Sequence, residues 1–92
     1  MNAQSRFVLS PHAMSRAIGE ETVILDLESG TYFGLDPVGA RMWQMLEEGK
    51  SVGEARDAIF EEYEVERDRL EVDLLALVGE LAERKLIIVS DG

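Results

Sequence analysis

Residues 22–46, TVILDLESGTYFGLDPVGARMWQML, decide the fold. Residues 22–28 alternate apolar and polar side chains, with Ile24 as the exception, and this period of two predicts a half-buried strand. The apolar positions expected on one face are Val23, Leu25 and Leu27. Ser29 and Gly30 follow as a tight turn, because glycine readily adopts the positive φ that a short hairpin loop needs. The stretch therefore begins as a β-hairpin.

The returning strand of this hairpin, Thr31–Leu35, is the candidate binding element. Phe33 and Leu35 share one face of it, and Tyr32 lies on the other. A strand edge without a partner presents free N–H and C=O groups that another backbone can pair with. Two roles stay open for Tyr32, which either touches a partner or braces the sheet through a cross-strand aromatic pair.

Two helices follow with clear boundary signals. Asp36-Pro37 predicts a helix start, since aspartate caps free amides and proline fits the first helical position. This helix ends at Gly49. Residues 51–54, SVGE, form a capping box that opens a second helix, which ends near Tyr63.

A third helix is predicted from Arg67 or Asp68 to about Lys85. Its core stripe is Leu70, Leu74, Leu77, Val78 and Leu81. A second apolar arc adjoins this stripe and comprises Val72, Leu75, Gly79 and Ala82. Glycine inside a helix costs about 1 kcal/mol relative to alanine, which favours a close approach at Gly79. Either a ligand or the strands and chain ends cover this arc.

Short extended segments complete the chain. Phe7–Leu9, Met14–Ile18 and Leu86–Val89 are the further strand candidates. The 92 residues suit one domain, 1–92, with a core of about 14–87. We predict an α+β fold, a three-stranded antiparallel sheet followed by three helices, which is the winged helix-turn-helix arrangement.

The chain is strongly acidic. It has 19 acidic and 9 basic residues, for a formal net charge of −10. This charge repels phosphate backbones, so nucleic acid is excluded as a partner, and a basic peptide would be attracted instead. The acidity is also consistent with a role in solubility alone. With no apolar run of membrane length and no signal segment, we expect no membrane association and a cytoplasmic location.

No catalytic or metal-binding constellation stands out. The chain has no cysteine and one histidine, His12, in an irregular segment, so a zinc site lacks ligands. The carboxylate pairs lie on polar helix faces, where solvation keeps both groups ordinary. Trp43, with Met42 and Met45, either lines a groove or packs in the core. We therefore predict no enzyme, no metal and no cofactor.

The order of several short motifs resembles the PqqD-like family, the RiPP recognition elements. The resemblance covers about Met14 to Ile87, and the stretch Tyr32–Arg41 is most similar to the stand-alone members in lasso-peptide pathways. The motifs are residues 24–27 (ILDL), 30–36 (GTYFGLD), 43–49 (WQMLEEG), 51–52 (SV), 63–65 (YEV), 72–75 (VDLL) and 81–87 (LAERKLI). Family members often have Gly-Leu where this chain has Lys85-Leu86, which is a minor departure.

The resemblance implies that the chain binds the leader region of a ribosomally made precursor peptide. The leader is expected to add to the third strand as an antiparallel strand, in a groove against the third helix. The implied peptide-binding residues are Thr31, Tyr32, Phe33, Gly34, Leu35, Asp68, Glu71, Val72, Leu75 and Gly79. Val72, Leu75 and Gly79 would form pockets for apolar side chains, and Asp68 and Glu71 would favour a basic residue at the rim.

The implied partners are the enzymes that process the precursor. The chain would present the precursor to a transglutaminase-like leader peptidase and, through this peptidase, to a cyclase. One alternative is a PqqD-type chaperone for a radical-enzyme pathway, such as pyrroloquinoline quinone biosynthesis. Another is an acidic winged-helix subunit that binds other proteins. The unpaired strand edge also predicts a homodimer that pairs edge to edge.

Overall fold

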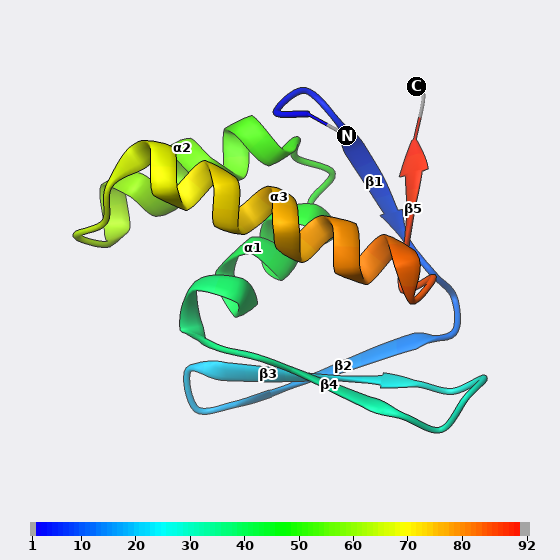
Figure 1. The fold of residues 1–92 in the computed structure, drawn as a ribbon. Coiled ribbons are helices and arrows are strands. Elements are labelled where there is room, and N and C mark those ends of the chain that lie inside the picture. The colour runs from blue at the N-terminus through cyan, green and yellow to red at the C-terminus, as the bar shows by residue number, and fades with distance from the viewer. Residues whose placement is uncertain (1, 91–92) are drawn as a thin grey trace.

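The computed structural model describes residues 2–90, which form an α+β fold with three helices after a hairpin-rich start (Figure 1). This confirms the predicted fold class. In chain order the elements are β1 (Arg6–Leu9), β2 (Ala13–Ile18), β3 (Glu21–Asp26), β4 (Tyr32–Leu35), α1 (Pro37–Glu47), α2 (Val52–Glu62), α3 (Arg67–Glu83) and β5 (Ile87–Ser90).

Two separate antiparallel sheets are present. The three-stranded sheet has the order β2-β3-β4, so β2 and β4 are its edges. Gly30 has the expected positive φ, +74°, but the predicted two-residue turn was wrong, because β3 ends at Asp26 and β4 begins at Tyr32, so the connection spans residues 27–31. The second sheet pairs β1 with β5, with Phe7 opposite Val89, and thereby joins the two ends of the chain (Figure 1). The sequence predicted both of these short strands but not their pairing.

The buried face of β3 differs from the prediction. Ile24, expected to be the exception to the alternation, is fully buried, whereas Leu27 lies beyond the strand and is 52% exposed. Thr22 is buried on the same face as Ile24, and Val23 is only half-buried on the other. The prediction was wrong because the face that is buried depends on which side of the sheet the helices cover, and they cover the side of Thr22 and Ile24.

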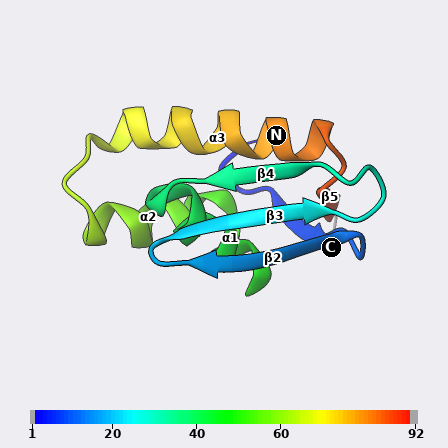
Figure 2. The same cartoon turned by 90° about the horizontal axis from the view of Figure 1, so that it is seen from below.

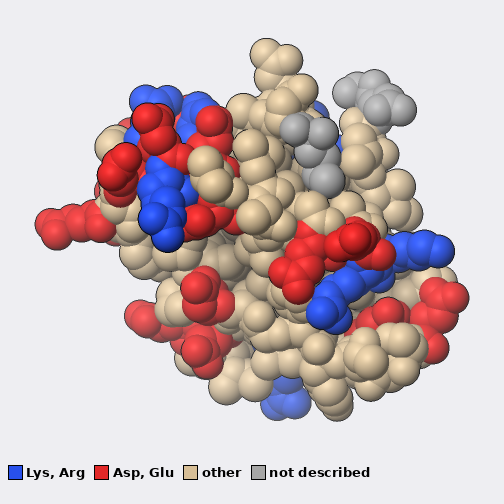
Figure 3. Space-filling view, viewed as in Figure 1, with Lys and Arg blue, Asp and Glu red and all other residues tan. Residues whose placement is uncertain are grey.

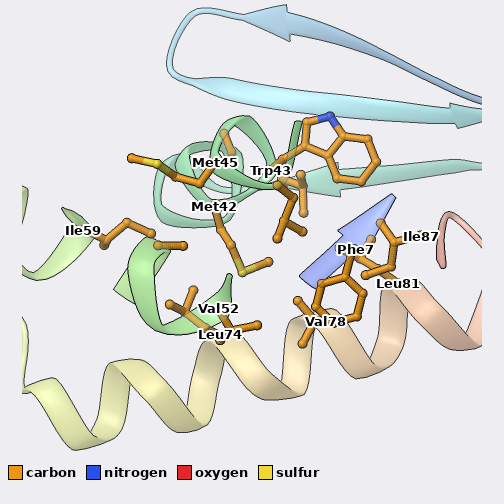
Figure 4. Close-up of a cluster of buried hydrophobic side chains, with 14 of the residues drawn as sticks. Phe7, Met42, Trp43, Met45, Val52, Ile59, Leu74, Val78, Leu81 and Ile87 are labelled. Carbon is orange, nitrogen blue, oxygen red and sulfur yellow. The ribbon is translucent and has the colours of Figure 1, made fainter. Parts of the chain in front are cut away.

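The core lies between the three-stranded sheet and the helices. Trp43 of α1 is 1% exposed, and its indole points toward the sheet (Figure 4). Phe7 of β1 and Ile87 of β5 pack on the other side, near Val78 and Leu81 of α3 (Figure 4). Trp43 is thus a core residue, as are Met42 and Met45.

Local caps fix where the helices begin. The Asp36 side chain accepts a hydrogen bond from Gly39 N at 2.8 Å and holds the end of β4 against α1. Ser51 and Glu54 form the predicted capping box of α2. From α2 the chain turns back, so that α3 runs alongside β4 beyond the free edge of the sheet (Figure 2). This arrangement creates the candidate site.

Candidate functional site

A groove lies between β4 and α3, with the start of α1 as its floor. Its hollow has a volume of about 420 Å³. The strand side and floor are formed by Phe33, Gly34, Leu35, Asp36, Val38 and Gly39, and the other side by Val65, Arg69, Leu70, Asp73, Leu74 and Leu77. Most of these side chains are apolar, and the charged ones lie on α3 or at the cap of α1. The hollow therefore suits an apolar side chain approached from outside.

The floor of the groove is closely packed around one glycine. A Cβ atom at Gly39 would lie 3.3 Å from Leu77 Cδ2 and 3.4 Å from Leu35 Cδ2. The two leucine methyl groups would have to move by a few tenths of an ångström to admit a side chain here. Gly39 therefore lies closely packed at the floor, between the end of β4 and α3.

One hydrogen bond at the hairpin turn fixes which groups of β4 bond to β3. Asp26 N donates to the Thr31 carbonyl oxygen at 2.9 Å. Bonded and non-bonded residue pairs alternate along an antiparallel ladder. Counting from this pair, Phe33 and Leu35 exchange their backbone hydrogen bonds with β3.

The backbone groups of Tyr32 and Gly34 consequently point to the free edge of the sheet. No other strand of residues 2–90 pairs with this edge. The edge lies next to the groove and runs along α3 (Figure 2). An extended peptide can pair with these groups and place alternate side chains in the groove.

A second, smaller hollow of about 220 Å³ continues the groove at the turn end of β4. Phe33 lines both hollows. The Arg84 guanidinium lies over the Phe33 ring, 4.8 Å from its centroid, which is within the range of a cation–π contact. Asp26 also lines this hollow, and Thr31 lies at its rim before β4 begins.

The charged groups along the groove are held by short-range partners. Arg69 pairs with Asp73 at 3.4 Å on α3, and Arg84, the C-cap of α3, pairs with Glu80 at 3.6 Å; the partners of each pair are four residues apart. At the turn, a hydrogen bond from the Ser29 hydroxyl lowers the pKa of Asp26 below its ordinary value. Acidic and basic side chains both lie over the face that carries α3 (Figure 3), so this face is not uniformly negative.

Comparison with known proteins agrees with this geometry. The sequence profile of the family described as "Coenzyme PQQ synthesis protein D (PqqD)" matches residues 21–87. The chain belongs to the PqqD family. The family resemblance noted from the sequence is thereby confirmed.

Two solved structures resemble this family member over most of its length. One, described as "TbiB1 in Complex with the TbiA(beta) Leader Peptide", is 47% identical, with a TM-score of 0.79 over 86% of this chain and 92% of that one. The other, "Lasso peptide synthetase B1 complexed with the leader peptide", is 34% identical, with a TM-score of 0.81 over 90% and 98% of the two chains. A search among curated proteins gave no match.

The structure brings the predicted strand residues together at one edge. Phe33, Gly34 and Leu35 line the groove, and Thr31 lines the second hollow although it lies outside β4. Tyr32 is 70% exposed on the outer face of the sheet, away from the groove.

The predicted helix residues do not lie in the groove. Asp68, Glu71, Val72, Leu75 and Gly79 are absent from the lining of both hollows. Glu71 instead forms an ion pair with Arg56 of α2. These five residues lie outside both hollows, on the side of α3 that turns toward α2 and solvent, and their part in peptide binding stays a prediction.

Sequence reasoning missed Arg69, Asp73, Leu77 and Arg84. These residues occupy the opposite flank of the core stripe of α3, and Leu77 had been assigned to the core. Both flanks of the stripe are partly apolar, and only the position of β4 determines which one borders the groove. The clue in the sequence was the repeat of oppositely charged pairs four residues apart, Arg69 with Asp73 and Glu80 with Arg84.

Within residues 2–90, no group of three or more histidine or carboxylate side chains could hold a metal ion. None of the helices in the described part of the chain has the length and apolar character that a membrane crossing requires.

Proposed function

We propose that this PqqD-family chain is a non-catalytic recognition protein that binds the leader region of a ribosomally made precursor peptide. The observation that carries the proposal is the unpaired edge of β4 beside an apolar groove. Both solved relatives described above are complexes with a leader peptide, and both cover more than four-fifths of this chain.

The leader would add to β4 as an antiparallel strand. The backbone of Tyr32 and Gly34 would supply hydrogen bonds that do not depend on the leader's sequence. Alternate leader side chains would enter the groove, where Leu35, Leu77 and the floor at Gly39 select for apolar groups. The helix wall of this site is the Arg69–Asp73–Leu77 flank, in place of the flank predicted from the sequence.

The bound precursor would then be presented to separate processing enzymes. The similarity to a lasso peptide synthetase B1 favours a lasso-peptide pathway, with a leader peptidase and, through it, a cyclase as partners in the cytoplasm. The family description, coenzyme PQQ synthesis, supports a second candidate, a peptide chaperone in a quinone pathway. The two candidates share the site and differ in the precursor, so peptide competition distinguishes them.

A proline at Gly34 tests the proposed mode of binding. Proline removes the outward N–H of this edge position and places a ring where the leader would pair, while the bonds of Phe33 and Leu35 to β3 stay intact. We expect Gly34→Pro to weaken binding of the fluorescently labelled TbiA(beta) leader peptide at least tenfold, since it removes one hydrogen bond and blocks its neighbours.

Ser15→Pro is the matched control. Ser15 lies on β2, opposite Ile24, with its backbone groups toward the other free edge of the sheet. It should leave leader affinity unchanged while perturbing the sheet to a similar degree. Equal binding by wild type and Gly34→Pro would exclude strand addition at β4. Absence of binding by the wild-type chain would count against the function itself.

A further inference from the structure

Two cations line the groove, Arg69 and Arg84, and Arg84 is the one that also contacts β4, through the Phe33 ring. Arg41 donates hydrogen bonds to Glu62 of α2, and Arg56 donates to Asp57 beside it and to Glu71 of α3; these bonds raise the pKa of both guanidinium groups. Within residues 2–90, the Arg84 guanidinium makes no hydrogen bond; it lies 4.8 Å from the centroid of the Phe33 ring and 3.6 Å from Glu80. Its side chain is 49% exposed, so its N–H groups are open to an incoming acceptor.

The other charges at this hollow do not occupy the guanidinium. Asp26 lines the hollow, but its carboxylate accepts hydrogen bonds from Ser29 Oγ and from Glu28 N, both at 2.9 Å. Glu80 is 51% exposed and beyond hydrogen-bond distance, so the pair with Arg84 is a weak surface ion pair. A carboxylate delivered next to Phe33 can therefore replace Glu80 as the partner of Arg84.

The register of an added strand places one leader side chain at this position. Phe33 and Leu35 point to the same side of β4, and successive side chains on one face are two residues apart. An antiparallel strand runs from the Leu35 end toward the Phe33 end. The leader residue opposite Leu35 enters the apolar hollow, and the residue two positions later lies opposite Phe33, next to Arg84.

We propose that Arg84 selects an acidic side chain in the leader, two residues after the apolar residue that fills the main hollow. This inference rests on the proposed function. It specifies which type of leader side chain binds at the charged end of the groove. Arginine suits the role because its planar fork can stack on Phe33 and still donate two parallel hydrogen bonds to a carboxylate. The net charge of −10 disfavours an acidic leader in general, so a local cation is needed to accept one.

The test exchanges charges between the protein and the peptide. The probes are labelled TbiA(beta) leader peptides in which one position at a time is changed to Glu or to Lys, titrated into wild type, Arg84→Glu and Arg84→Gln. At one position, the wild-type chain should bind the Glu peptide about fivefold more tightly than the Lys peptide, as expected for one partly exposed ion pair. Arg84→Glu should reverse this preference, and Arg84→Gln should abolish it.

Arg16→Glu is the matched control, because Arg16 is exposed on β2 and the substitution changes the net charge by the same amount. It should leave the preference at that position unchanged. If the parent leader binds in a Gly34-dependent way but no position responds to residue 84, the inference about Arg84 is overturned and the proposed function stands. If the wild-type chain binds none of the peptides, both are overturned.

Discussion

The two flanks of α3 differ in their ion pairs. This difference distinguishes the flank that packs on α2 from the flank that borders the groove. On the flank facing α2, charged residues pair across to the other helix: Arg67 with Asp57 at 2.9 Å, and Glu71 with Arg56. On the flank facing β4, the ion pairs within residues 2–90 join residues of α3 and its C-cap, and Arg84 reaches β4 only through the Phe33 ring. A flank that is joined to its neighbour by ion pairs is closed by the chain, whereas a flank without such ion pairs remains available to a partner.

The open flank follows from the packing of the floor. α3 is held to α2 by ion pairs and to α1 by buried side chains, and the lack of a side chain at Gly39 leaves room for Leu77 near the end of β4, whose edge stays unpaired. The apolar hollow therefore lies between α3, which α1 and α2 hold in place, and β4, which has no strand paired to its outer edge.

The largest expected effect comes from the stripe that both flanks share. Leu74 is 1% exposed at the centre of α3, and Leu74→Ala should lower the free energy of unfolding by about 3 kcal/mol because it leaves a cavity in the core. Urea denaturation measures this. Leu77→Ala, on the half-buried open flank, should cost clearly less. Equal losses would mean that the open flank is as tightly packed as the core.

The next effect separates the flanks by binding. Leu77→Arg places a charge in the apolar hollow and should weaken binding of the TbiA(beta) leader peptide about tenfold or more, since a buried charge without a partner is costly. Leu75→Arg, on the α2 flank, should leave the affinity unchanged. Fluorescence anisotropy of the labelled peptide, titrated with each variant, measures both affinities. The reverse result would restore the flank predicted from the sequence.

This pair of variants also marks the limit of sequence reasoning. The hairpin, the caps at Asp36 and Ser51 and the stripe of α3 depend on neighbours along the chain, so local patterns predicted them. The strand half of the site follows from the same hairpin. These features need no knowledge of how distant elements pack.

The helix half of the site depends on tertiary packing. Whether β4 lies beside Leu77 or beside Leu75 depends on how distant elements pack, and the charged pairs four residues apart are the one local sign of it in α3. Gly79 was interpreted as a point of close approach, but it does not line the groove, whereas Gly39 does. The misassigned face of β3 at Ile24 has the same origin, because burial there depends on the helices that cover the sheet.

A smaller effect is expected at the end of α3, next to Arg84. Lys85 has φ +61°, a left-handed conformation that costs a residue with a side chain more than it costs glycine. It closes the helix with hydrogen bonds from Lys85 N to Ala82 O and from Leu86 N to Leu81 O. Lys85→Gly should therefore stabilise the fold by about 0.5–1 kcal/mol, the difference between relief of strain and the larger entropy of unfolded glycine.

The turn after α1 provides the control for that change. Gly49 occupies the same kind of position at φ +83°, and nothing lies within 4 Å of an added Cβ. Gly49→Ala should lower the thermal midpoint through backbone strain alone, while Lys85→Gly raises it and leaves leader binding intact. A fall in the midpoint of Lys85→Gly would show that the lysine side chain stabilises the turn.

The smallest effect concerns the charges of the closed flank, and it depends on pH. Hydrogen bonds from Arg56 at 3.0 Å and Arg67 at 2.9 Å lower the pKa of Asp57 below its ordinary value in the folded chain. A carboxyl with a lowered folded pKa stabilises the fold above its unfolded pKa, and this contribution is lost as the pH falls through the folded value. The thermal midpoint of wild type should therefore exceed that of Asp57→Asn at neutral pH, and the difference should disappear as the pH falls below the ordinary pKa range of aspartate.

High salt should also narrow the difference at neutral pH, because the ion pairs of Asp57 are exposed and screened by salt. A gap that stays constant down to the acid limit would mean that Asp57 acts through packing, and that charge does not hold α3 to α2.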